Sequence, residues 1–289
     1  MRPRHPKRDQ VPFPLRILGS SVVVLVILLM GLPMVNVLAV SLSEAGASDA
    51  PGLVLFPSPA TLQGYFFIWN YVDLRGPFLN TLYVSVVGTL IHVILSSLAG
   101  YILTQQDLPF RGLMTSFVLL TMTVPSELAL IGIYTVNKDL QLVNTYAGLI
   151  VNGMISGFSV LLMRNYFSSI PTSLVEAARI DGCSEFKIFR RVYLHLSVPG
   201  IMTIGTLELI RRWNNISLTV ALISDMKKWT LPVVLRWILF DQTSTSGTEY
   251  IFNNAKMAAV VLTALPLVIL YFFAQRFFTA GALLGSTKG

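Results

Sequence analysis

The chain has 289 residues, of which 54% are hydrophobic and only 12% are charged. Soluble domains carry about 25% charged residues, so this composition excludes an ordinary soluble protein. The net charge of +7 could suit a nucleic-acid partner, but the basic residues lie at the edges of apolar runs, where retention beside a membrane explains them. We therefore expect no nucleic-acid partner.

Several apolar runs are long enough to cross a bilayer, which takes about 20 residues. They predict six transmembrane helices, at 17–43, 78–103, 113–137, 146–163, 198–223 and 257–275. The third run contains Glu127, and the fifth contains Glu208, Arg211 and Arg212. The fold class that we expect is an all-α integral membrane protein.

The distribution of Lys and Arg predicts the orientation, because basic flanks are retained on the cytoplasmic side. With the N-terminal tail inside, the cytoplasmic segments hold thirteen basic residues and the outer segments six. We expect a multi-pass protein of the bacterial inner membrane with both termini in the cytoplasm. A secretory signal peptide is the alternative for the N-terminus, but the first apolar run is about twice the usual length of a signal core.

The reactive side chains form no cluster in the sequence. Cys183 is the only cysteine, and His5, His92 and His195 fall in three separate segments. This spacing predicts no disulfide, no metal site and no catalytic residues. The sequence also has no GxxxxGK[ST] loop, so we expect no bound cofactor in this chain and no enzyme activity.

The polar loop from Ser168 to Pro199 is patterned as two short helices with a turn at Gly182. Its basic and aromatic residues would suit a hairpin that lies on the lipid surface. Its Ala-rich first helix, with Glu176, would equally suit docking into a groove on a partner protein. Periodicity does not separate these two interpretations.

The loop resembles the EAA loop of the permease subunits of bacterial ABC importers. The resemblance rests on Glu176, Ala177 and Ala178, followed by Asp181 and Gly182, and it extends over residues 78–289. LPFRG at 108–112 and MRNYFSSIP at 163–171 agree with it, and the C-terminal end is similar to that of the smaller permease of maltose-type carbohydrate importers. His195 stands where the family usually has Pro.

The resemblance implies a coupling helix near residues 172–182 that is seated on a cytoplasmic ATPase. Phe186, Phe189 and Leu194 would pack the loop against the rest of the permease. The implied partners are a second homologous permease, an ATPase dimer that carries ATP and Mg, a periplasmic or extracytoplasmic sugar-binding protein, the oligosaccharide cargo and membrane lipids.

The expected domains are a cytoplasmic basic tail at 1–16, a first helix and periplasmic loop at 17–77, a permease core at 78–276 with its coupling loop at 164–198 and a periplasmic loop at 224–256, and a cytoplasmic tail at 277–289.

The charges of the fifth span lie roughly 15–20 Å from the cytoplasmic edge, where charge is costly and usually faces a cavity or a partner. Glu208 could form a structural ion pair with Arg211 or Arg212, which leaves one guanidinium to meet an anionic sugar. The candidate substrate path is Glu208, Arg211, Arg212, Trp213, Asn214 and Asn215. Together with the resemblance, which leans toward permeases for uronate oligosaccharides such as alginate, this favours an acidic saccharide. A neutral oligosaccharide is the alternative.

Glu127 follows Pro125 and Ser126, and could be a proton-linked group or part of a helix kink or gate. We favour the kink or gate, because the permeases that the chain resembles import without proton coupling. A secondary transporter is the next class of function, but it normally has repeats and broken helices in matched halves, which we do not find in the sequence. An integral-membrane enzyme is the third class, and it lacks a cluster of catalytic residues.

Overall fold

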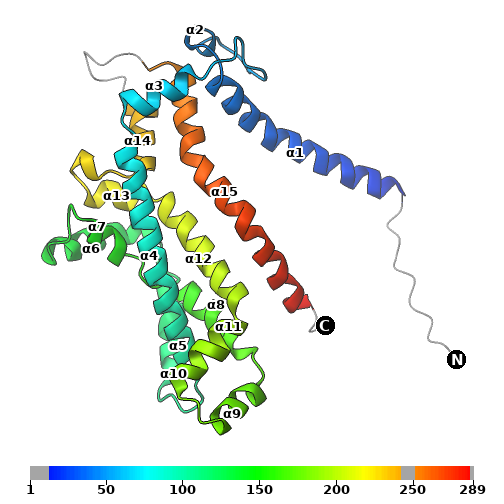
Figure 1. Ribbon diagram of the computed structural model, residues 1–289, viewed down its shortest axis with the longest axis vertical. Helices are drawn as coiled ribbons and strands as arrows, with labels where there is room; N and C mark the ends of the chain where they lie inside the picture. The colour runs from blue at the N-terminus through cyan, green and yellow to red at the C-terminus, as the bar shows by residue number, and fades with distance from the viewer. Residues whose placement is uncertain (1–12, 242–250, 287–289) are drawn as a thin grey trace. The chain divides into compact units, whose positions relative to one another are not determined.

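The structure is a computed structural model that describes residues 13–241 and 251–286 (Figure 1). Residues 1–12 of the expected basic tail, residues 242–250 of the expected periplasmic loop and the last three residues lie outside this description. Within the described ranges the chain forms helices and turns, with one isolated β-bridge between Ser43 and Ala60. The predicted all-α class is confirmed.

The helices follow one another along the chain with short connections. They are α1 (Phe13–Ser41), α2 (Ala45–Ser48), α3 (Gln63–Tyr71), α4 (Arg75–Ile102), α5 (Arg111–Thr121), α6 (Ser126–Asp139), α7 (Tyr146–Val151), α8 (Gly157–Ser168), α9 (Thr172–Ile180), α10 (Glu185–Ile188), α11 (Leu194–Leu196), α12 (Val198–Trp213), α13 (Ser217–Leu222), α14 (Leu231–Arg236) and α15 (Asn253–Ser286). Short π-helices at Phe189–Tyr193 and Trp237–Asp241 and a 3₁₀ turn at Met226–Lys228 join some of them.

Three helices of the described chain are long and apolar enough to cross a membrane: Leu15–Ser41 within α1, α4, and Asn253–Gln275 within α15. They correspond to the first, second and sixth predicted spans. A bent pair, Glu185–Leu196 with Val198–Trp213, could form a fourth span, and its two parts meet at 78°.

The other three predicted spans are each broken into two helices, which the apolar runs did not reveal. The third span breaks between α5 and α6 at Pro125, which has no backbone N–H to continue a helix. The fourth breaks between α7 and α8, where Gly153 has φ +85°. The fifth breaks between α12 and α13, where the side chain of Asn215 accepts a hydrogen bond from the N–H of Leu218. Our prediction of three continuous spans in these regions is therefore wrong.

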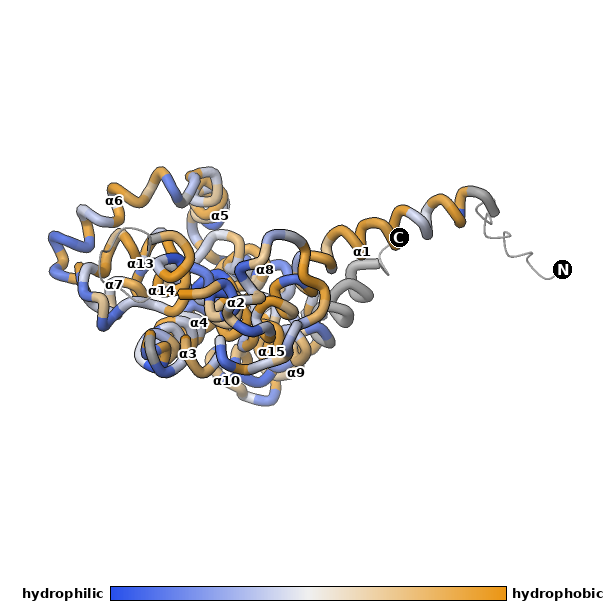
Figure 2. The backbone as a smooth tube through the Cα atoms, turned by 90° about the horizontal axis from the view of Figure 1, so that it is seen from above, coloured by the Kyte–Doolittle hydropathy of each residue, from blue (hydrophilic) through white to orange (hydrophobic). Residues whose placement is uncertain are grey.

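Two compact units make up the chain, and the first contains residues 1–72 and 247–262. In this unit α1 exposes an apolar surface along most of its length, as the orange tube in Figure 2 shows. At the end of α1, Ser41 and Tyr65 share a hydrogen bond of 2.8 Å between their hydroxyls. Asn254 at the start of α15 donates its amide to the carbonyl of Ser43. These bonds hold the described ends of α1, α3 and α15 together.

The second unit contains residues 73–246 and 263–289, and α4 is at its centre. α4 packs along both α8 and α12. The contact with α8 is close at Gly100, where an added Cβ would lie 2.8 Å from the Cβ of Met163. A cluster formed by Met163, Phe167, Phe189 and Ile204 fills the adjacent space. All the residues of the candidate site lie in this unit.

We predict opposite effects for two Gly→Ala substitutions. Gly112→Ala in α5 meets open space, so the higher helix propensity of Ala should stabilise the protein by up to about 1 kcal/mol. Gly100→Ala forces α4 and α8 apart and should destabilise it by about 1–3 kcal/mol. Thermal unfolding in detergent measures both, and equal stability of the two variants would contradict the packing of α4 on α8.

Candidate functional site

One buried carboxylate holds two guanidinium groups in α12. The Oε1 atom of Glu208 accepts hydrogen bonds of 2.6 Å from Nη2 of Arg211 and from Nε of Arg212, and its Oε2 accepts one of 2.7 Å from Nε of Arg211. The Glu208 side chain is 4% exposed, and the Nδ1 atom of His92 lies 3.6 Å from Oε1. Glu208 thus pairs with both arginines, although the i+3 and i+4 spacing left open which one it would choose.

Arg212 is the buried member of the pair, with 3% of its side chain exposed. Its Nη1 and Nη2 atoms donate to the carbonyls of Leu149 and Ile150 at 3.2 and 3.3 Å. These carbonyls belong to the last turn of α7. No helical turn follows, so they have no backbone N–H partner within the helix. The guanidinium also lies against Gly88 of α4, at a distance that leaves no room for a Cβ atom. Arg212 therefore joins α4, α7 and α12.

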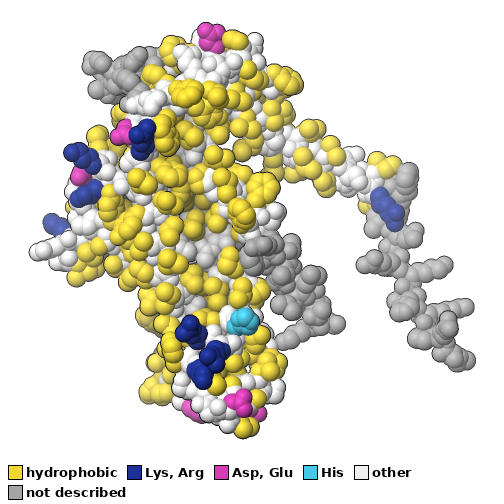
Figure 3. Space-filling model, in the orientation of Figure 1, with side chains coloured by type: hydrophobic (Ala, Val, Ile, Leu, Met, Phe, Trp, Pro, Cys, Tyr) yellow, Lys and Arg dark blue, Asp and Glu magenta, His cyan; other side chains and the backbone are white. Residues whose placement is uncertain are grey.

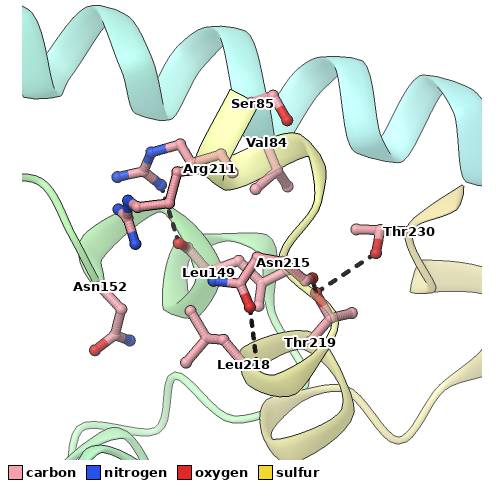
Figure 4. A pocket seen from close by; sticks show the side chains of 10 residues that line it. Val84, Ser85, Leu149, Asn152, Arg211, Asn215, Leu218, Thr219 and Thr230 are labelled. Carbon is pink, nitrogen blue, oxygen red and sulfur yellow. Dashed lines mark hydrogen bonds between the residues drawn. The ribbon is translucent and has the colours of Figure 1, made fainter. Parts of the chain in front are cut away.

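Arg211 is the accessible member, with 49% of its side chain exposed. It lines a cavity of about 300 Å³, within the range of small-molecule sites. The other lining residues come from the three helix breaks and from the helices beside them: Glu127, Leu130, Ile133, Asn152, Gly153, Asn215, Ser217 and Leu218. Figure 4 shows the adjoining inner recess, which Arg211, Asn152 and Asn215 also line. The breaks thus bring charged and amide side chains to the wall of a cavity in an apolar protein.

The α7–α8 break is fixed by a chain of hydrogen bonds through His92, which is fully buried in α4. Its Nδ1 lies 2.8 Å from the carbonyl of Gly153, which can only accept, so Nδ1 carries a proton. Its Nε2 lies 2.8 Å from the hydroxyl of Ser159. The isolated position of His92 in the sequence predicted a structural role, which agrees with these contacts. The sequence did not indicate that His92 lies close to Glu208.

The remaining residues of the predicted substrate path lie elsewhere. Trp213 is buried, donates its indole N–H to the carbonyl of Thr263 at 3.1 Å and stacks edge-on against Phe78. It therefore offers no stacking face to the cavity in this structure. Asn214 is exposed but does not line the cavity, whereas Asn215 does. Glu127, which we had assigned to a kink or gate, lies both at the break and on the cavity wall.

The predicted coupling loop forms two helices, α9 and α10, with the predicted turn at Gly182, where φ is +74°. Glu176, Ala177, Asp181 and Gly182 are exposed, and Ala178 is partly so. Leu174 is 47% and Ile180 is 87% exposed on the same helix, which leaves apolar surface uncovered. In Figure 3 acidic and basic side chains gather at the end of the molecule that α9 and α10 form. This surface therefore combines exposed apolar side chains with exposed charged ones.

The loop is anchored to the rest of the unit from inside. Phe189 is buried, with its ring 5.0 Å from that of Tyr101 and 6.3 Å from that of Phe167. Leu194 packs against the same cluster. Phe186, by contrast, is 69% exposed, so our expectation that it packs against the permease is wrong.

A carboxylate ties this loop to α4. Glu185 accepts a hydrogen bond of 2.9 Å from Nε of Arg179 and one of 2.8 Å from the hydroxyl of Tyr101. The hydrogen bond from Arg179, followed by that from Tyr101, lowers the pKa of Glu185 below its usual value. The carboxylate therefore stays ionised, and both bonds are present, at neutral pH.

A polytopic helical protein with broken helices around a cavity that contains charged side chains, and with an exposed loop, has the architecture of a membrane transport subunit. Residues 92–282 match the family described as the binding-protein-dependent transport system inner membrane component. The chain belongs to this family of ABC importer permeases. Accordingly it is a transport subunit of the inner membrane and not an enzyme, and the ATPase is a separate chain.

Individual relatives agree with the family. The permease protein YtcP of a polygalacturonan/rhamnogalacturonan transport system of Bacillus subtilis is 32% identical over 266 residues, which cover 89% of this chain and 92% of that one. The arabinooligosaccharide permease protein AraQ of Halalkalibacterium halodurans is 30% identical and covers 89% and 91%. A chain of a bacterial ABC transporter that imports the acidic polysaccharide alginate is similar in structure, with a TM-score of 0.85, 25% identity, and coverage of 94% and 100%.

Removing the shared carboxylate should destabilise the protein more than removing the carboxylate and one guanidinium together. Glu208→Gln leaves the buried charge of Arg212 without an anion and should cost about 3–5 kcal/mol. The double variant Glu208→Gln with Arg212→Gln removes that buried charge and should recover part of the loss. Thermal unfolding in detergent compares the parent protein, the single variants Glu208→Gln and Arg212→Gln, and the double variant. A double variant that is less stable than Glu208→Gln by the full cost of Arg212→Gln alone would contradict the pairing.

Proposed function

We propose that this chain is the transmembrane permease subunit of an ATP-driven, binding-protein-dependent importer of oligosaccharides, and that its cargo is acidic. The acidic character of the cargo is inferred from the accessible guanidinium of Arg211 on the cavity wall. Glu208 holds it through two hydrogen bonds, so it is oriented before any cargo arrives. A planar guanidinium matches a sugar carboxylate well.

The charge of the cluster supports an anionic cargo. One carboxylate, Glu208, is shared by Arg211 and Arg212, which leaves one positive charge over. Asn152 and Asn215 add amide groups that can bind sugar hydroxyls, and Leu130 and Ile133 offer apolar contact to the C–H face of a ring. Two relatives, from a polygalacturonan/rhamnogalacturonan transport system and from an alginate importer, point in the same direction, whereas AraQ, from an arabinooligosaccharide transport system, favours a neutral cargo.

Glu127 modifies this proposal, since its carboxylate lies on the wall of the same cavity. A carboxylate there accepts hydrogen bonds from sugar hydroxyls but repels a second anionic group. The cavity would therefore suit an oligosaccharide that presents one acidic group to Arg211 and hydroxyls to Glu127.

The importer needs partners that this chain does not supply. We propose a second homologous permease that completes the translocation path, an ATPase dimer with ATP and Mg that contacts α9, and an extracytoplasmic sugar-binding protein. The exposed apolar and acidic surface of α9 supports the ATPase contact through Glu176, Ala177, Ala178, Asp181 and Gly182. In this proposal the permease itself holds no cofactor.

Arg211→Gln should lower uptake of an acidic oligosaccharide relative to a neutral one of equal length. A charged hydrogen bond is worth about 1.5–3 kcal/mol, so the ratio of acidic to neutral uptake should fall about tenfold or more. Glu127→Gln should raise the same ratio. Proteoliposomes with the complete transporter measure both uptakes, and Lys138→Gln, an exposed cation of α6 outside the cavity lining, is the control. An unchanged ratio in Arg211→Gln would remove the acidic-cargo proposal.

Glu176→Lys should abolish sugar uptake and its link to ATP hydrolysis, because it reverses a charge on the proposed ATPase contact. The complex is purified, and ATP hydrolysis with and without the binding protein is compared with uptake. Glu44→Lys reverses an exposed charge outside the loop and should leave both unchanged. Normal uptake by Glu176→Lys would contradict the role of α9.

A further inference from the structure

The loop is joined to α4 by a continuous set of contacts. Glu185 is held from one side by Arg179, the residue before the last of α9, and from the other by Tyr101, the residue before the last of α4. The ring of Tyr101 packs on Phe189 and, at 4.9 Å, on Tyr193. The tie therefore joins the proposed ATPase contact to the end of a 28-residue helix.

The same helix reaches the cavity. About 14 Å along α4 from Tyr101, at a rise of 1.5 Å per residue, His92 approaches Glu208 and binds the α7–α8 break at Gly153. One turn further, Gly88 lies against the guanidinium of Arg212. α4 thus contacts the loop at one end and the groups that hold Arg211 at its middle.

We propose that Glu185 and Tyr101 are positioning residues that make the proposed coupling helix α9 move with α4, and that α4 carries this movement to the guanidinium pair beside the cavity. A displacement of α9 would then shift His92 and Gly88 against Glu208 and Arg212, and so change the exposure of the cavity around Arg211. This inference rests on the proposed contact of α9 with an ATPase, but not on the acidic character of the cargo.

The Tyr101 hydroxyl strengthens the link that the ion pair makes. The Arg179–Glu185 pair alone is half exposed, and exposed ion pairs contribute little rigidity. The hydroxyl of Tyr101 adds a second hydrogen bond to the same carboxylate, on a ring that is held by Phe189 and Tyr193. The two bonds together fix the carboxylate between the two helices.

The test measures the accessibility of the cavity wall to a thiol reagent, and needs no sugar. Cys183 is the only cysteine, so Cys183→Ser with Ser217→Cys places one thiol on the cavity wall. The rate of maleimide labelling is measured in the complete transporter, with and without ATP and vanadate to trap the ATPase. Nucleotide trapping should change this rate. Tyr101→Phe removes one of the two hydrogen bonds to the carboxylate and should reduce that change about threefold. Glu185→Gln weakens both bonds and should reduce it at least as much, and the double variant should reduce it no further than Glu185→Gln alone.

Two controls match these variants. Tyr166→Phe removes a hydroxyl from the neighbouring helix α8, and Lys187→Gln removes an exposed charge from the same loop; both should retain the full change. Size-exclusion chromatography shows whether the ATPase remains bound in every variant. A labelling rate that does not respond to trapping in the parent protein, or that responds equally in Tyr101→Phe, Glu185→Gln and the controls, would overturn the proposal. Failure of the acidic-cargo proposal would appear only in the uptake ratios.

Discussion

The arrangement of the cavity depends on the buried carboxylate of Glu208. Two guanidinium groups within one helix would repel each other and could not be buried without an anion. With Glu208 between them, Arg212 can enter the protein and bind the end of α7, while Arg211 remains at the cavity. One acidic side chain therefore determines both the packing of α12 and the charge that the cavity presents.

The three broken helices line the same cavity. Backbone groups that a break releases inside a membrane need partners, and at the α7–α8 break side chains from other helices supply them. Arg212 binds the carbonyls at the end of α7, and His92 binds that of Gly153. The breaks bring Glu127, Asn152 and Asn215 to one cavity, which uninterrupted helices would have kept apart.

The sequence predicted the class, the coupling loop and the charged helix, because each has a local signal: long apolar runs, the EAA pattern, and charges three and four residues apart. It did not predict the breaks, since hydropathy averaged over about 20 residues does not detect a turn at Pro125 or Gly153. Nor did it predict the role of His92, whose contacts with Gly153 and Ser159 are 61 and 67 residues away. Trp213 was misassigned because the sequence does not show which face of α12 is buried.

The dependence of Arg212 on other helices has a consequence for how the protein is made. Glu208, Arg211 and Arg212 would be costly in lipid if α12 entered the bilayer alone. The groups that satisfy them, Gly88 and His92 on α4 and the last carbonyls of α7, precede α12 in the chain. The ribosome therefore makes α4 and α7, which hold the partners of these charges, before it makes α12. α12 can then insert against helices that already contain those partners, and not into lipid alone.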